Sequence, residues 1–128
     1  MTAPICAECG ATTRLTNGAE IYPHRPDLAQ RAFWRCACGA YCGCHKGTDR
    51  PLGTPAGPTL RRERLMLHAQ FDKLWKGSPA RSARGEAYAW LGRELELTPP
   101  ECHIGLFDAA LCARAFRALR LRLYSPAE

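Results

Sequence analysis

The 128-residue sequence has no long hydrophobic run: its apolar stretches last only a few residues, whereas a membrane-spanning helix needs about 20. Its first residues, 1–6, contain neither a basic stretch nor an apolar segment of the length that a secretory signal peptide has. We therefore expect a soluble, cytoplasmic protein. In such a reducing compartment, its eight cysteines indicate metal binding ahead of disulfides.

The chain is also too short for a large multidomain enzyme or for two independent hydrophobic cores. With 46% hydrophobic and 23% charged residues, it has the composition of an ordinary globular protein, which excludes a low-complexity or disordered chain. Acidic residues are outnumbered, since 18 Lys and Arg against 12 Asp and Glu give a net charge of +6. This excess permits a polyanionic partner but does not require one.

The amino-terminal cysteines have the spacing of metal ligands. Cys6 and Cys9 form a Cys-x-x-Cys pair that can bind one tetrahedral ion, and the glycine that follows allows a turn whose backbone N–H groups point at the sulfurs. The second pair has two candidates, within 36–39 and within 42–44, and only the first is also followed by glycine. The favoured ligands of one structural zinc ion are Cys6, Cys9, Cys36 and Cys38. Because only one residue separates Cys36 from Cys38, Cys42 and Cys44 remain alternates.

The segment between the two cysteine pairs predicts β-structure. Asn17-Gly18 is a strong hairpin signal because both residues tolerate positive φ, so we expect strands over 12–16 and 19–22 joined by this turn. A third strand is expected over 32–35. A cysteine pair, a hairpin, a strand and a second cysteine pair, in this order, predict a zinc ribbon with four cysteine ligands. A zinc ion held by four cysteines has no position open to water, so it is structural.

The rest of the chain predicts about three α-helices. Apolar periodicity and capping residues place them over 59–77, over 82–97 and from Asp108 onward. We therefore predict an α+β fold in which a zinc ribbon and loop, residues 1–57, pack on a helical part, residues 58–128, in one shared core.

Two basic regions are candidates for binding. The loop 46–58 is rich in Gly and Pro, and its Lys46 and Arg50 could surround an anion together with free backbone N–H groups. On the last predicted helix, arginines such as Arg114 and Arg117 point outward and could contact phosphates.

A few titratable residues are candidates for catalysis. His68 and Asp72 lie four residues apart on a predicted helix, so the carboxylate could orient the imidazole for acid/base work, although a structural hydrogen bond is the commoner role of such a pair. The dipeptides Cys44-His45 and Cys102-His103 would have to meet to form a second metal site, and no spacing rule supports that.

Several motifs occur in an order that identifies a resemblance. They are the early Cys-x-x-Cys-Gly, the stretch 40–48 followed by 51–54, the helical segments 68–75 and 87–91, and the stretch 102–108. Together they resemble a zinc-finger-containing domain family of unknown function encoded by bacteriophages and prophages. The resemblance implies a protein of the bacterial host cytoplasm, ligands at Cys6, Cys9, Cys36 and Cys38, and an apolar residue where this chain has Cys42. It also singles out polar residues outside the ligand set: His45, His68, Asp72, His103 and Asp108.

The ribbon part is also similar to the zinc ribbons at the carboxyl ends of bacterial type IA topoisomerases. Those ribbons bind single-stranded DNA through basic and aromatic residues. The positions that match here are Arg14, Arg31, Phe33, Trp34 and Arg35. The similarity implies an accessory protein that binds nucleic acid, DNA ahead of RNA, with Phe33 or Trp34 stacked on bases.

Two other classes of function compete with nucleic-acid binding. A module that docks on a host enzyme or defence complex suits the dispersed charge equally well, and would depend on an apolar anchor. A small metal-dependent nuclease or hydrolase would use His45, His68, Asp72 and His103 around a further ion. We rank nucleic-acid binding first, protein binding second and enzymatic activity third.

Overall fold

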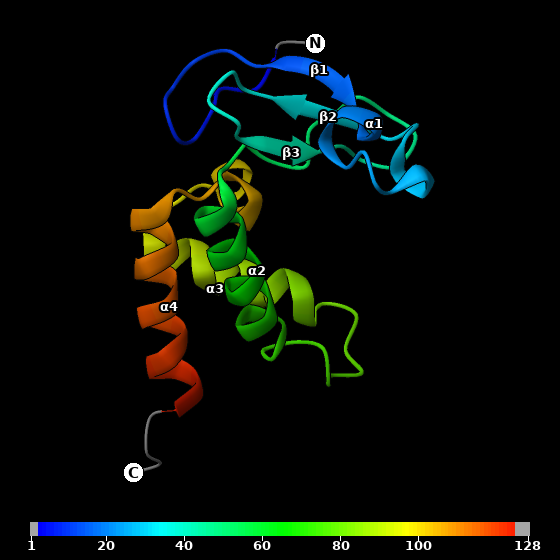
Figure 1. Ribbon diagram of the computed structural model, residues 1–128. Helices are drawn as coiled ribbons and strands as arrows, with labels where there is room; N and C mark the ends of the chain where they lie inside the picture. Colours follow the sequence, from blue (N-terminus) through cyan, green and yellow to red (C-terminus); the bar gives the residue numbers. More distant parts are fainter. Residues whose placement is uncertain (1–2, 125–128) are drawn as a thin grey trace. The chain divides into compact units, whose positions relative to one another are not determined.

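A computed structural model of the protein describes residues 3–124, and the chain divides into two compact units, Met1–Arg61 and Arg62–Glu128. The first unit contains the strands and the amino-terminal cysteines, and the second is helical (Figure 1). The predicted α+β class is therefore confirmed. No helix among the described residues is both long and apolar enough to cross a membrane.

The first unit is built on a three-stranded antiparallel sheet. Strands β1 (Arg14–Asn17), β2 (Ala32–Arg35) and β3 (Tyr41–Gly43) lie in this order, with β2 in the centre (Figure 1). The strand predicted over 32–35 is thus confirmed. Across the sheet, Trp34 of β2 is paired with Leu15 on one side and with Cys42 on the other.

Both faces of β2 are covered. Phe33 and Trp34 are consecutive and point to opposite faces, yet each is only 8% exposed. Phe33 packs edge-on against the rings of Tyr22 and Tyr41, at centroid distances of 5.8 and 6.1 Å. On the other face, Trp34 Nε1 donates a hydrogen bond of 2.7 Å to the carbonyl oxygen of Asp49. These contacts bind the loops on either side of the sheet to the central strand.

The hairpin predicted at Asn17-Gly18 is wrong. Asn17 ends β1 and caps the short helix α1 (Gly18–Ile21), because its Oδ1 accepts hydrogen bonds from the N–H groups of Ala19 (3.1 Å) and Glu20 (3.3 Å). The chain then passes through the 3-10 helix η1 (Pro26–Leu28) and returns as β2, the true partner of β1. The short polar side chain that suits asparagine to a turn also makes it a good N-cap, so the dipeptide alone does not distinguish the two.

Within the described residues the second unit contains three α-helices, which agrees with the prediction of about three. They are α2 (Pro58–Asp72), which begins in the first unit, α3 (Ala83–Leu95) and α4 (Ala109–Tyr124). The 3-10 helices η2 (Pro99–Glu101) and η3 (Ile104–Leu106) connect α3 to α4. Helix α2 ends before the predicted residue 77, because beyond Asp72 the backbone turns through bonds to the third preceding residue, such as Leu74 N–H to the Phe71 carbonyl (3.0 Å).

The core of the second unit is apolar, with one buried arginine. Arg64 is 9% exposed, and its Nε donates to the carbonyl oxygen of Phe107 at 2.9 Å. Asp108 caps α4 as predicted, since its Oδ1 accepts the N–H of Leu111 at 2.9 Å. The innermost side chains, each at most 1% exposed, are Leu67, Phe71, Leu91, Ile104, Phe107, Cys112, Ala115 and Leu119.

Candidate metal centre

Two similar turns present the four cysteines of the predicted ligand set. In the first, the N–H of Gly10 (φ +75°) bonds to the carbonyl oxygen of Cys6 at 2.9 Å, and the flanking residues Ile5 and Thr12 form a β-bridge. In the second, which follows β2 directly, the N–H of Gly39 (φ +99°) bonds to the carbonyl oxygen of Cys36 at 2.9 Å. Glycine serves both turns because positive φ strains other residues.

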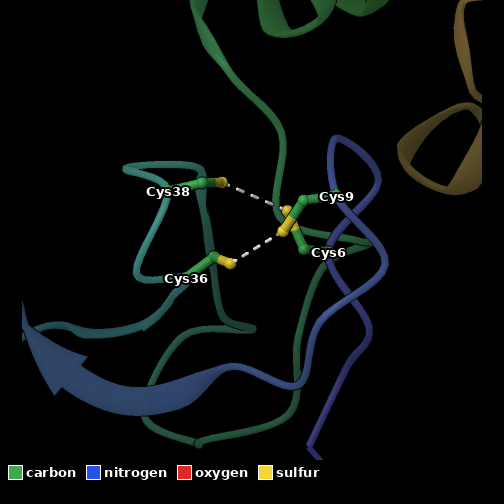
Figure 2. A group of neighbouring side chains, drawn as sticks. All are labelled: Cys6, Cys9, Cys36 and Cys38. Carbon is green, nitrogen blue, oxygen red and sulfur yellow. Dashed lines mark hydrogen bonds between the residues drawn. The ribbon is translucent and has the colours of Figure 1, made fainter.

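The four thiols converge on one point between these turns (Figure 2). Their sulfurs all lie within 4.8 Å of one another, with Cys6 Sγ 3.6 Å from Cys38 Sγ and Cys9 Sγ 3.4 Å from Cys36 Sγ. Four sulfurs at the usual Zn–S distance would stand about 3.8 Å apart at the corners of a tetrahedron. The donor set and its spacing therefore fit a tetrahedral thiolate-binding ion, and zinc is the usual one.

The surroundings of Cys6 favour the thiolate that a metal requires. Burial alone would raise the pKa of this thiol, but backbone N–H groups of Cys9 and Glu8 and the thiol of Cys38 lower it to about 7. The Glu8 N–H, for example, points at Cys6 Sγ from 3.3 Å. A lower pKa increases the fraction of thiolate available at neutral pH.

The centre also supplies part of the packing of the first unit. Cys6 and Cys36 are buried and form a small cluster with Ala40, whereas Cys9 and Cys38 are exposed. An ion held by all four would have no position left for water, so the centre suits a structural role.

The alternates Cys42 and Cys44 lie outside this centre. Cys42 is buried in the sheet, and its Sγ donates to the carbonyl oxygen of Gly53 at 3.5 Å. Within residues 3–124, the four amino-terminal cysteines form the one group of three or more His, Cys, Asp or Glu side chains close enough together to bind a metal.

The candidates for acid/base chemistry have structural partners or lie apart from one another. His68 Nδ1 is 3.8 Å from Asp72 Oδ1, but the same carboxylate accepts a hydrogen bond from Trp75 Nε1 (3.2 Å) and pairs with Lys76 (3.4 Å). This network ties the end of α2 to the turn after it. In the same unit, the ring of His103 packs near Tyr88. His45 lies in the first unit and is exposed.

The arginines predicted from the topoisomerase ribbons divide into two groups. Arg14 and Arg35 both pair with Glu20, whose pKa falls to about 2 through hydrogen bonds from Arg14 and Thr16. Glu20 thus offsets one of these two positive charges. Arg31 forms no salt bridge with a described residue, although its charge adds to the hydrogen bond from Arg25 in lowering the pKa of Asp27.

Of the arginines predicted to bind from the last helix, Arg114 forms a hydrogen bond within the protein, whereas Arg117 is exposed and forms none with a described residue. Arg114 Nη2 donates to the carbonyl oxygen of Leu95 at 3.2 Å, which links α4 to the end of α3. Arg117 points to solvent from the middle of α4 and pairs with no other described side chain.

One groove of the first unit collects several of the predicted residues. It has a volume of about 950 Å³ and is lined by Arg31, Phe33, His45 and Lys46. These residues come from two segments, 31–33 and 45–46, and nothing in the sequence indicates that the two segments meet. The apolar lining of the groove includes the predicted Phe33 and also Leu52, which is 56% exposed in the loop after β3 and lies in the matched stretch 51–54 but was not predicted to bind.

Comparison with known protein families identifies the domain. Residues 2–122 match a family described as a zinc-finger-containing domain, so the match extends over both units. No curated protein and no solved structure is significantly similar to the chain. The geometry of the four cysteines and the family description agree on a metal-binding domain.

Proposed function

The chain belongs to the zinc-finger-containing domain family, and from this premise we propose that its first unit is a zinc ribbon that binds single-stranded nucleic acid, DNA ahead of RNA. The groove lined by Arg31 and Lys46 is the observation that carries this proposal. The resemblance to phage and prophage proteins favours an accessory role during infection of a bacterial host.

Two basic side chains of the first unit that form no salt bridge with a described residue, Arg31 and Lys46, line this groove. Elsewhere in the unit, Arg14 and Arg35 pair with Glu20, Arg25 pairs with Asp27 at 2.7 Å, and Arg61 stands 3.9 Å from the centre of the Tyr41 ring. The basic side chains that have no ion pair or ring contact with a described residue are Arg31, Lys46 and Arg50.

The geometry of the groove suits a single strand. Arg31 and Lys46 line it from different segments, together with one carboxylate, that of Asp49. Leu52 offers an apolar surface for bases, while phosphates would meet the cations. The stacking on Phe33 or Trp34 expected from the sequence is not part of the proposal, because both rings are covered.

Binding of a fluorescent 12-nucleotide oligo(dT) to the zinc-loaded protein, measured across a salt series, tests this proposal. We expect Arg31→Gln/Lys46→Gln to weaken binding about tenfold at low salt. Since each phosphate contact to a single strand contributes about 0.7 to the slope of log affinity against log salt, two lost contacts should reduce that slope by about 1.4.

The matched control is Arg14→Gln/Arg25→Gln, which removes the same charge from residues that pair with Glu20 and Asp27. It should change affinity less than threefold. Equal losses in the two double variants would show that only net charge matters and would refute the groove as the site.

A second candidate function is protein binding through α2 and α4. Large apolar side chains are exposed on these helices, among them Leu65 (73%) and Met66 (55%), and Met66 lines a groove of about 490 Å³ with Phe116 and Tyr124. Exposed apolar surface of this kind marks protein interfaces. Should oligo(dT) fail to bind even at low salt, host-protein binding that depends little on salt and is lost in Met66→Asp would support this alternative.

A further inference from the structure

The second unit contains a groove that neither the metal centre nor the proposed nucleic-acid site uses. Its volume is about 690 Å³, and it runs along α3 and the segment that follows it. Apolar atoms form most of its lining. The volume falls within the range of about 300–1,000 Å³ that is typical of sites for small organic ligands.

Small residues on one side of α3 create this groove. Gly85, Ala89 and Gly92 recur at helical spacing and lie along it. Close packing explains Gly92, because a Cβ there would lie 3.2 Å from the Leu97 carbonyl oxygen. It does not explain Gly85, where a Cβ would meet nothing within 4 Å. A helical glycine beside open space weakens the helix by about 1 kcal/mol relative to alanine without any packing gain.

A buried cysteine is part of the lining of the groove. Cys102 is 3% exposed, and its Sγ donates a weak hydrogen bond to the Tyr88 carbonyl oxygen at 3.7 Å. Burial raises the pKa of this thiol, so it remains neutral at physiological pH. A neutral, polarizable thiol is a good contact for an aromatic ring.

The charged residues that line the groove are Arg84, Arg93 and Glu96. Arg84 and His103 line it together with Tyr88, and the Arg84 guanidinium stands 5.0 Å from the centre of the Tyr88 ring. At the carboxyl end of α3, the groove is lined by Arg93 and by Glu96, the residue that follows the helix. The one carboxylate of the groove therefore lies at the end of α3 opposite to Arg84. The Arg84 end therefore suits an anionic group.

We propose that this groove binds a small aromatic anion, with its ring along Gly85, Ala89 and Cys102 and its carboxylate, sulfonate or phosphate at Arg84. The inference is independent of nucleic-acid binding, because its residues all belong to the second unit. The apolar lining of the groove favours an aromatic ring, and the guanidinium of Arg84 favours a negatively charged group on that ring.

Naphthalene-2-sulfonate is a suitable probe, and its uncharged isostere naphthalene-2-sulfonamide tests the charge requirement. Titration of the full zinc-loaded chain by calorimetry and by NMR should give saturable sulfonate binding at sub-millimolar concentration. The sulfonamide should bind about tenfold more weakly. Shifts should centre on residues 84–103. Absence of saturation up to 5 mM (roughly the weakest specific affinity of interest) would overturn the proposal, and equal affinity for the two probes would overturn its anionic part.

Two glycine variants provide the matched comparison. Gly85→Leu fills the groove and should weaken sulfonate binding more than tenfold, yet it should fold, because the site of its Cβ is open and leucine favours a helix. Gly77→Leu has equally open space but lies outside the groove, and should bind like the unaltered protein. Arg84→Gln should weaken binding of the sulfonate and leave that of the sulfonamide within twofold. An equal effect of the two glycine variants would overturn the location.

Discussion

Cys36→Ser is expected to abolish metal binding and to unfold the first unit. Cys36 is buried between Cys6 and Ala40, and its sulfur lies 3.4 Å from that of Cys9. Binding of a structural zinc ion stabilises small zinc domains by about 10–16 kcal/mol, and the small cluster around Cys36 supplies little packing to replace it. Metal content by atomic emission and NMR dispersion of residues 3–61 are the two measurements. A strong chelator should have the same effect on the unaltered protein.

Cys44→Ser is the control for this variant. Cys44 belongs to the same unit and was an alternate ligand, but it lies outside the four-thiol group. We expect this variant to retain one zinc ion per chain and the dispersed spectrum. Retention of the metal by Cys36→Ser, or its loss from Cys44→Ser, would contradict the assignment of the centre.

Gly18→Ala should be the most damaging change of a single methyl group in the first unit. A Cβ at Gly18 would lie 1.8 Å from the carbonyl oxygen of Leu28, and the Gly18 N–H donates to the carbonyl oxygen of Arg31 at 2.9 Å. Neither backbone segment can remain in place, so we expect the free energy of unfolding to fall by about 3 kcal/mol or more, as measured by denaturant titration. Because Arg31 moves with this segment, oligo(dT) binding should weaken as well.

Gly43→Ala is the matched control for Gly18→Ala. Gly43 is also in the first unit, but the nearest atom to an added Cβ is the Leu52 Cδ1 at 3.5 Å, an ordinary contact. We expect the free energy of unfolding to change by less than about 1 kcal/mol. If the two variants proved equally stable, the close approach of α1 to the η1 loop would be refuted.

Local signals were sufficient wherever spacing along the chain decides the outcome. The glycine that follows Cys9 and the one that follows Cys38 allow the two turns that bring four thiols together, and each turn is only a few residues long. Helical periodicity and the Asp108 cap likewise predicted α4 within one residue of its start. The family resemblance rested on the same kind of short, ordered motif.

Local signals failed where one residue type serves two structures. Asn17 satisfies a hairpin turn and a helix N-cap equally well, and the choice depends on whether its strand pairs with the next segment or with the distant β2. The aromatic pair Phe33-Trp34 resembles an exposed stacking surface in sequence. Only the loops that return over both faces of the sheet show that the two rings are buried.

The proposed binding surfaces depend on tertiary structure, which determines which charged side chains are paired and which stretches of backbone remain uncovered. Arg14 and Arg31 are the same residue type in the sequence, but Arg14 forms an ion pair with Glu20, whereas Arg31 lines a groove. Gly85 and Gly92 are equivalent on a helical wheel, but only at Gly92 does neighbouring chain occupy the space of a side chain. Contacts between segments that are distant in the sequence produce no local sequence pattern, so only the tertiary structure shows them.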